Sequence, residues 1–152
     1  MTEFSSLNRQ DALRITAAMK TLATYVFWQH RETGDMSTAD LREYRDHDQA
    51  EVLQARHLAD HVAVLQKVLF IDDIYAHPLI RRQDILSGHR IRAFAGTPIY
   101  CEQGGFQGVL CTVDTKRRRW EDDDIEQLRN TARQMLRRVT TPREPSKELE
   151  RN

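Results

Sequence analysis

The sequence predicts an α+β fold in which a central antiparallel sheet is covered by helices from both ends of the chain. Residues 68–114 contain three short apolar runs, rich in β-branched and aromatic residues and bounded by turn residues, and such runs are typical of strands. Residues 8–22 and 122–138 carry apolar side chains three and four positions apart, a spacing that indicates amphipathic helices. An antiparallel sheet must bury a face, and helices of this kind can cover it.

Length and charge limit the class of protein. The 152 residues are enough for one domain with its own core. Lys and Arg together number 23, as do Asp and Glu, so no net charge draws the chain to nucleic acid or to an anionic membrane. No run approaches the roughly 18 apolar residues of a membrane span, and the N-terminal residues lack the basic and apolar blocks of a secretory signal. We therefore expect a cytoplasmic protein without membrane association, and nucleic acid is not the expected partner.

We expect a single domain over residues 1–139 and a mobile polar tail over residues 140–152. The tail contains two prolines and no apolar anchor, which is typical of segments that stay outside a core. The two cysteines, Cys101 and Cys111, flank a Gly-Gly dipeptide. Because Cys111 lies inside an apolar run, we expect a buried thiol and not a disulfide, which fits a reducing compartment.

The first half of the chain begins with the helix expected over residues 8–22. The run TYVFW follows at residues 24–28 and is strongly β-forming. Val26 also continues the helical spacing of the preceding segment. The pattern therefore predicts either a strand here or an extension of the helix to His30.

The middle of the chain is predicted to hold a second helix and the first strand of the apolar region. The helix is expected over about residues 48–67, and residues 36–46 are either a strand or an earlier start of that helix. A strand is expected over residues 68–71, and it ends in the carboxylate pair Asp72 and Asp73.

The second half is predicted to be a loop, a hairpin and a closing helix. The loop over residues 75–90 is expected to contain a short helical turn. Residues 91–100 and 107–113 form the hairpin, because Gly104 and Gly105 suit a tight turn. The closing helix begins with acidic residues and ends with arginines, which complements the helix dipole.

Several of these segments together resemble the central part of a GAF domain. They are Asp72-Asp73-Ile74, His77-Pro78-Leu79, the run IRAFAGTPI at 91–99, the run GVLCTVDT at 108–115 and the helix over 122–138. The resemblance implies that the first and last helices lie together on one face of the sheet and form a dimer bundle. The region between the first two helices is shorter and more polar than is usual in the family, which predicts an abbreviated hairpin or a helix there.

The function that this resemblance implies is a signalling module without catalytic activity. A small ligand would bind between the sheet and the 75–90 loop, and the terminal helices would pass its presence to a second copy or to a partner protein. The predicted cavity residues are Tyr75, Arg92, Phe94, Thr97, Tyr100 and Val113. The loop region carries His77, Arg81, Arg82, His89, Arg90 and Arg92, a set that favours an anionic ligand. The sequence does not identify a cofactor.

Two other functions stay open at this point. One is a pure interaction protein whose pocket is filled by its own side chains and whose helices mediate dimerisation. The other is a thiol redox sensor at Cys101, for which a basic neighbour such as Arg92 would have to lower the pKa of the thiol. The GAF-type methionine sulfoxide reductases are similar in fold, but their cysteine motifs fall at positions that hold other residues here.

The remaining motifs favour structural readings, and we predict no metal site and no catalytic residue. His57 and His61 have a spacing that zinc sites use, but no third ligand is evident. Asp72 and Asp73 could serve as paired carboxylates, but only one of two neighbours on a strand faces inward. The KRRR run at 116–119 could bind phosphate, but EDDD at 121–124 follows it and cancels its charge.

Overall fold

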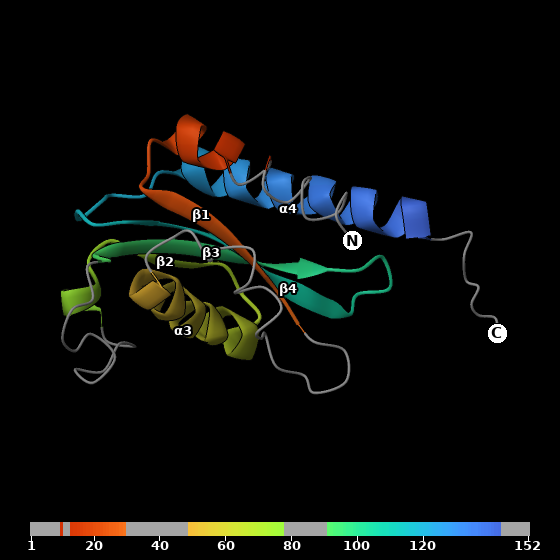
Figure 1. Ribbon diagram of the computed structural model, residues 1–152, viewed down its shortest axis with the longest axis horizontal. Helices are drawn as coiled ribbons and strands as arrows, with labels where there is room; N and C mark the ends of the chain where they lie inside the picture. The colour runs from red at the N-terminus through yellow and green to blue at the C-terminus, as the bar shows by residue number, and fades with distance from the viewer. Residues whose placement is uncertain (1–9, 11–12, 30–48, 78–90, 144–152) are drawn as a thin grey trace.

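The computed structural model describes residues 10, 13–29, 49–77 and 91–143. They form three layers, with a four-stranded antiparallel sheet between α3 on one face and the N-terminal helical residues with α4 on the other (Figure 1). The strand order is β1-β4-β3-β2. The elements are β1 (Ala23–Trp28), α3 (Gln49–Leu65), β2 (Leu69–Ile71), the 3-10 turn η1 (Ile74–Ala76), β3 (Ala93–Tyr100), β4 (Phe106–Asp114) and α4 (Asp122–Arg143). The predicted fold class, including the two chain ends on one face, is confirmed.

The centre of the sheet is the β3–β4 hairpin. Its register runs from Ala93 opposite Asp114 to Ile99 opposite Gly108, with an irregularity at Tyr100. The hairpin turns through Gly104, whose φ of 93° lies in the left-handed region that favours glycine. The Gly-Gly turn expected from the sequence is therefore present.

The run TYVFW forms strand β1, which pairs along its length with β4. The preceding helical residues, 13–19, end at Lys20, whose φ of 55° breaks the helix. Alternation along β1 directs Tyr25 and Phe27 toward α3 and Val26 toward the terminal helices. Because both faces of the sheet are covered, the strand is apolar at nearly every position. Its sequence is therefore compatible both with a strand and with the helical spacing of the preceding segment.

Two apolar clusters, one on each face of the sheet, form the core. The α3-side cluster joins α3 to the sheet through Tyr25, Phe27, Val52, Ala55, Leu58, Ala59, Val62, Leu69, Ile71, Ile74, Ile91, Phe94, Val109, Cys111 and Val113. The terminal-helix cluster consists of Ile15, Met19, Val26, Ala93, Ala95, Ile99, Leu110, Trp120, Leu128, Ala132 and Met135. The two ends of the chain thus share one core layer, as Figure 1 shows for the red and blue helices.

Arg118 fastens the N-terminal helical residues to the rest of the domain. Its guanidinium donates to the carbonyl oxygens of Met19 and Lys20, at 2.8 and 2.9 Å, and to the Asp114 carboxylate at 3.0 Å. It also lies over the Trp120 ring, 5.0 Å from the ring centroid. These carbonyls end a helical segment and lack partners within it, so the arginine acts as a cap supplied from elsewhere in the chain. This member of the KRRR run is therefore structural.

A chain of threonine hydroxyls lies beside this cap. Thr16 donates to Thr24 at 2.8 Å, Thr24 donates to Thr112 at 3.0 Å, and Thr112 donates to the Ala23 carbonyl at 3.0 Å. Since Thr112 has only one hydroxyl proton, the 2.6 Å contact with Thr21 must be a bond that Thr21 donates. The network links β1 and β4 to the N-terminal helical residues.

Some boundaries differ from the predicted ones. The first helix ends at Met19, three residues earlier than expected, and α4 continues through residues 140–143, which the sequence predicts as part of the tail. The expectations for residues 36–46, for residues 78–90 of the loop and for residues 144–152 fall outside the described residues. Within the described part of the chain, no helix is both long enough and apolar enough to cross a membrane.

Candidate ligand-binding site

The carboxylate of Asp73 holds Arg92 at the junction between β2 and β3. Asp73 follows β2 after one residue, and Arg92 immediately precedes β3, the neighbouring strand. The guanidinium donates from Nε to Oδ1 at 3.1 Å and from Nη2 to Oδ2 at 3.0 Å, so the pair is bidentate. Asp73 Oδ1 also accepts from the backbone N–H of Tyr75 at 3.2 Å. The hydrogen bonds from Arg92 lower the pKa of Asp73 below its usual value, so the carboxylate is charged near neutral pH.

Tyr75 covers the other side of the Arg92 guanidinium. The guanidinium carbon lies 4.6 Å from the centroid of the tyrosine ring, within the range of a cation–π contact. The Arg92 side chain is still 35% exposed. The Arg92 backbone is held by its N–H, which donates to Asp114 O, and by its carbonyl, which accepts from Ile74, each at 2.7 Å. A cation is thereby held in a defined place with part of its surface open to solvent.

Asp72, unlike Asp73, accepts hydrogen bonds from the segment that leads into α4. Its carbonyl accepts from the backbone N–H of Arg118 at 3.0 Å, and its Oδ1 accepts from the backbone N–H of Trp120 at 3.4 Å. The Trp120 indole N–H in turn donates to Ile71 O at 3.0 Å. Trp120 is 9% exposed and belongs to the terminal-helix cluster. The end of β2 is therefore bonded directly to the segment that leads into α4.

A cavity of about 420 Å³ opens at this junction. It is lined by Phe70, Asp72, Asp73, Ala76, His77 and Trp120. Burial lowers the pKa of the half-buried His77, the charge of His61 lowers it further, and Asp72 opposes both. The imidazole is therefore favoured in its neutral form beside two carboxylates.

A comparison with family models gives one match, to the GAF domain, over residues 10–138. The chain belongs to the GAF domain family. GAF3 from Slr1393 of Synechocystis sp. PCC6803, in its photoproduct state, is similar in structure with a TM-score of 0.66 and 12% identity, over 97% of this chain and 99% of that one. No curated protein matched the sequence.

Two further solved structures are similar to this chain. A phycocyanobilin-bound GAF domain from a cyanobacterial phytochrome has a TM-score of 0.63 and 14% identity, over 92% of this chain and 86% of that one. Part of a methyl-accepting chemotaxis protein has a TM-score of 0.62 and 18% identity, over 92% and 90%. At these identities the likeness establishes the fold, and the family is one of sensor and signalling domains that bind small ligands.

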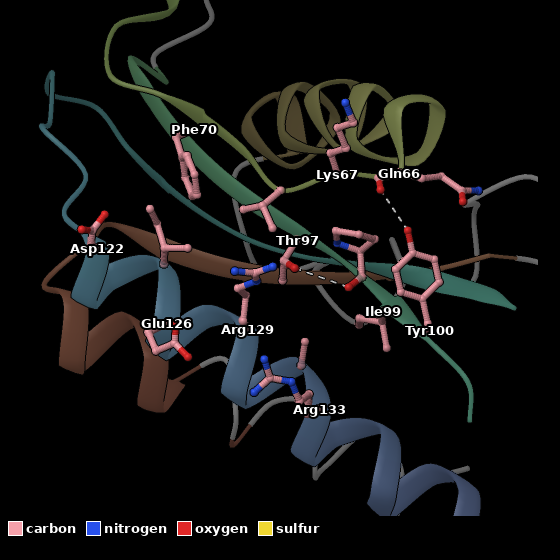
Figure 2. A pocket seen from close by; sticks show the side chains of 14 residues that line it. Gln66, Lys67, Phe70, Thr97, Ile99, Tyr100, Asp122, Glu126, Arg129 and Arg133 are labelled. Atoms are coloured by element: carbon pink, nitrogen blue, oxygen red, sulfur yellow. Dashed lines mark hydrogen bonds between the residues drawn. The ribbon is translucent and has the colours of Figure 1, made fainter. Parts of the chain in front are cut away.

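The structure distributes the six predicted cavity residues of this GAF domain over three places. Tyr75 and Arg92 lie together beside Asp73, which lines the cavity described above, but neither of them lines that cavity itself. Phe94 and Val113 are paired across β3 and β4, and both are 0% exposed in the α3-side cluster. Thr97 and Tyr100 line a separate groove beside α4 (Figure 2). Phe94 and Thr97 are an odd number of residues apart on one strand, so their side chains face opposite sides of the sheet.

Sequence reasoning missed the role of Asp72 and Trp120 in joining the site to α4. A signal was present, because Trp120 is the only apolar residue within the charged run KRRRWEDDD. A large aromatic residue in such a run indicates a buried anchor. Its partner on β2 depends on the tertiary fold.

The two cysteines lie apart from this site. Cys111 is fully buried, and burial raises the pKa of its thiol strongly. The Cys101 sulfur accepts from the backbone N–H of Gly105 at 3.2 Å within the hairpin turn. Arg92 and Cys101 flank opposite ends of β3, so Arg92 is not the basic neighbour that the redox hypothesis requires. Both thiols are unpaired.

His57 and His61 lie on α3 with their ring centroids 5.8 Å apart in an edge-to-face arrangement. The predicted closeness of the two imidazoles is present. Over the described ranges, no group of three or more His, Cys, Asp or Glu side chains is arranged to hold a metal ion.

The lowered pKa of His77 predicts a pH-dependent stability. The folded state binds the imidazole proton less readily than the unfolded chain, whose histidine pKa is about 6.5. The folded state should therefore be most stable above that value and lose stability as the pH falls below it. We expect His77→Gln to show a smaller loss than the wild type between urea titrations at about pH 7.5 and about pH 5.5. Equal losses in the two proteins would contradict this assignment.

Proposed function

We propose that this GAF domain is a sensor without catalytic activity, which binds a small anionic ligand beside Arg92 and signals through its terminal helices. The observation that supports it most directly is that two adjacent carboxylates have different hydrogen-bond partners. Asp73 holds Arg92 and the η1 turn, whereas Asp72 holds the segment that enters α4. A change at the ligand side would thus reach the helices through neighbouring residues of one short turn.

An anion is the favoured ligand because Arg92 has more donors than its bonds to the described residues use. A guanidinium has five N–H groups, and Asp73 takes two of them. The side chain is partly exposed and is bonded to Asp73 of the cavity lining, and the adjoining segment 78–90 contains Arg81, Arg82 and Arg90 in the sequence. A carboxylate or phosphate group matches this chemistry.

The proposed relay is a competition for Arg92. A bound anion would draw the guanidinium away from Asp73 and relax the turn that Asp73 caps through Tyr75. Asp72, the preceding residue, would then shift its bonds to the backbone of residues 118 and 120. The ligand would thereby favour one packing of α4 over another, which is a population shift between two states.

The ligand site is tested by thermal shift against a panel of small carboxylates and nucleotides. A compound that binds the folded state raises the melting temperature. We expect Arg92→Gln to weaken the binding of such a compound about tenfold, because a charged hydrogen bond is lost. Arg119→Gln is the matched control, since Arg119 is exposed, lies outside both cavities and, unlike Arg92, is not the residue that Asp73 holds. A compound that binds wild type and R92Q equally would place its site elsewhere.

The relay is tested separately with the same compound. Hydrogen exchange of the α4 amides between Leu128 and Met135 should change on binding in the wild type. Asp72→Ala removes a negative charge from the cavity lining, so it should bind the compound at least as tightly. At saturating compound it should lose most of the exchange change, since it removes the acceptor for Trp120 N. Tight binding with unchanged α4 exchange in the wild type would refute the relay and leave the ligand site intact.

The proposal includes a cytoplasmic location and a homodimer or partner protein at the terminal helices. The two unpaired thiols support a reducing compartment. Leu13 in the N-terminal helical segment and Leu22 just after it are exposed apolar side chains, which supports a contact there. Sedimentation velocity of the whole chain tests the dimer.

A ligand-free interaction protein is the second candidate function. The observation that favours it is the filling of the sheet's α3 face, where Phe94 and Val113 are completely buried. A panel in which no compound raises the melting temperature, together with a dimer in sedimentation, would support this function over the first.

A further inference from the structure

A second and larger hollow lies on the opposite side of the sheet from α3. This α4 groove has a volume of about 760 Å³ and runs between α4 and the β2–β3 side of the sheet (Figure 2). Its apolar lining includes Val68, Phe70, Ile99 and Ile125. The volume falls within the range of about 300–1,000 Å³ that small-molecule sites have. The groove is distinct from the cavity lined by Asp72 and Asp73, which shares only Phe70 with it.

Charged side chains give the α4 groove an acidic end and a basic end. Asp122, Glu126, Arg129 and Arg133 line it from α4 at spacings of three and four residues, which places them along one face of the helix. From Glu126 to Arg133 the helix rises about 10 Å. Lys67 adds a further positive charge from the opposite wall. An anion in the groove would therefore be drawn to the arginine end and repelled from the start of α4.

Thr97 brings a buried hydroxyl to this groove. The residue is 4% exposed, yet it lines the hollow. Its hydroxyl donates to the neighbouring Pro98 carbonyl at 3.4 Å, which is long for a hydroxyl donor. A better acceptor could therefore replace that carbonyl at little cost. Figure 2 shows Arg129 extending from α4 toward β3, in the direction of Thr97.

We infer that the α4 groove is a second binding site, which takes a small carboxylate with an apolar body. The carboxylate would accept hydrogen bonds from the Arg129 guanidinium and the Thr97 hydroxyl. The apolar body would lie against Phe70, Val68 and Ile125, where its burial supplies the rest of the affinity. Asp122 and Glu126 fix the orientation by excluding the carboxylate from their end. This inference does not depend on the site at Arg92.

The test uses decanoate, below its micelle concentration, with the full chain. Calorimetry and methyl NMR should report saturable binding, with shifts at Ile125 and Ile99 of the groove. Arg129→Gln should weaken the binding about tenfold, and Arg119→Gln should leave it within about twofold. Both arginines are exposed, so neither change should affect folding. Decyltrimethylammonium, with the same tail and the opposite charge, should bind at least about tenfold more weakly than decanoate.

A second variant, Thr97→Val, keeps the shape of the side chain and removes its hydroxyl. We expect about threefold weaker decanoate binding, with urea unfolding used to confirm that the variant is folded. Equal binding of decanoate to R129Q and wild type would overturn the inference. The inference would also be overturned if decyltrimethylammonium bound as tightly as decanoate, or if the NMR shifts were confined to Leu58 and Val109 of the α3-side cluster. Absence of decanoate binding up to about 1 mM would overturn it as well.

Discussion

Replacing Trp120 with alanine should lower the free energy of unfolding by about 3–5 kcal/mol, the usual cost of truncating a buried aromatic residue. The indole fills the terminal-helix cluster between the end of β2 and the start of α4. Its removal leaves a cavity there and deprives the Ile71 carbonyl of its indole donor. Urea titration followed by far-UV circular dichroism measures the change.

Two further variants separate packing from hydrogen bonding at this position. Trp120→Phe keeps most of the ring and loses the N–H, so we expect a loss of about 1 kcal/mol. Tyr75→Ala truncates an aromatic residue that is 52% exposed and should cost about 1 kcal/mol or less. If Trp120→Ala costs no more than Tyr75→Ala, the indole is not an anchor between β2 and α4.

Replacing Gly108 with alanine should cost about 3 kcal/mol and loosen β1 from the sheet. A Cβ atom at this position would collide with the backbone oxygen of Phe27 and lie 3.0 Å from the Trp28 Cα. Both obstacles are backbone atoms of β1, which pairs with Gly108 through Trp28. No side-chain rotation relieves such a clash, so the strands must separate locally, at the upper end of the cost of overpacking.

Gly105→Ala is the matched control in the same hairpin. Its Cβ would meet the Cys101 sulfur at 3.2 Å, and that side chain can move, so we expect a loss below about 1 kcal/mol. Amide exchange should show faster opening of the β1–β4 hydrogen bonds in G108A and no such change in G105A. Unaltered β1 protection in G108A would show that β1 tolerates a side chain at position 108.

The elements that the sequence predicted well are those with a local signal. The β3–β4 hairpin was predictable because Gly104 and Gly105 favour a turn between two β-forming runs. The helix α4 was predictable because acidic residues begin it and apolar residues recur at helical spacing. In contrast, β1 could not be distinguished from a helix, because a strand covered on both faces lacks alternation.

The candidate site was only partly predictable for a related reason. The sequence predicted Arg92 and Tyr75 as cavity residues without linking one to the other. In the structure the Asp73 carboxylate bonds to both, and the Arg92 guanidinium carbon lies 4.6 Å from the centroid of the Tyr75 ring. Thr97 was assigned to the same cavity, but the pleat of β3 directs it toward α4. Whether a side chain of β3 faces α3 or α4 depends on where these two helices pack against the sheet, and no local sequence pattern contains that information.

The sequence by itself determined the α+β class, the hairpin, the closing helix and the membership in a known family, because turn chemistry and hydrophobic period act over a few residues. Only the tertiary structure decided that Asp72 bonds to the segment before α4, that Asp73 bonds to Arg92, and that β1 pairs with β4 at the edge of the sheet. It also decided that α4 and the sheet enclose a charged groove. These features join residues up to about ninety positions apart, such as Ala23 and Val113, and such contacts form only when the whole core packs.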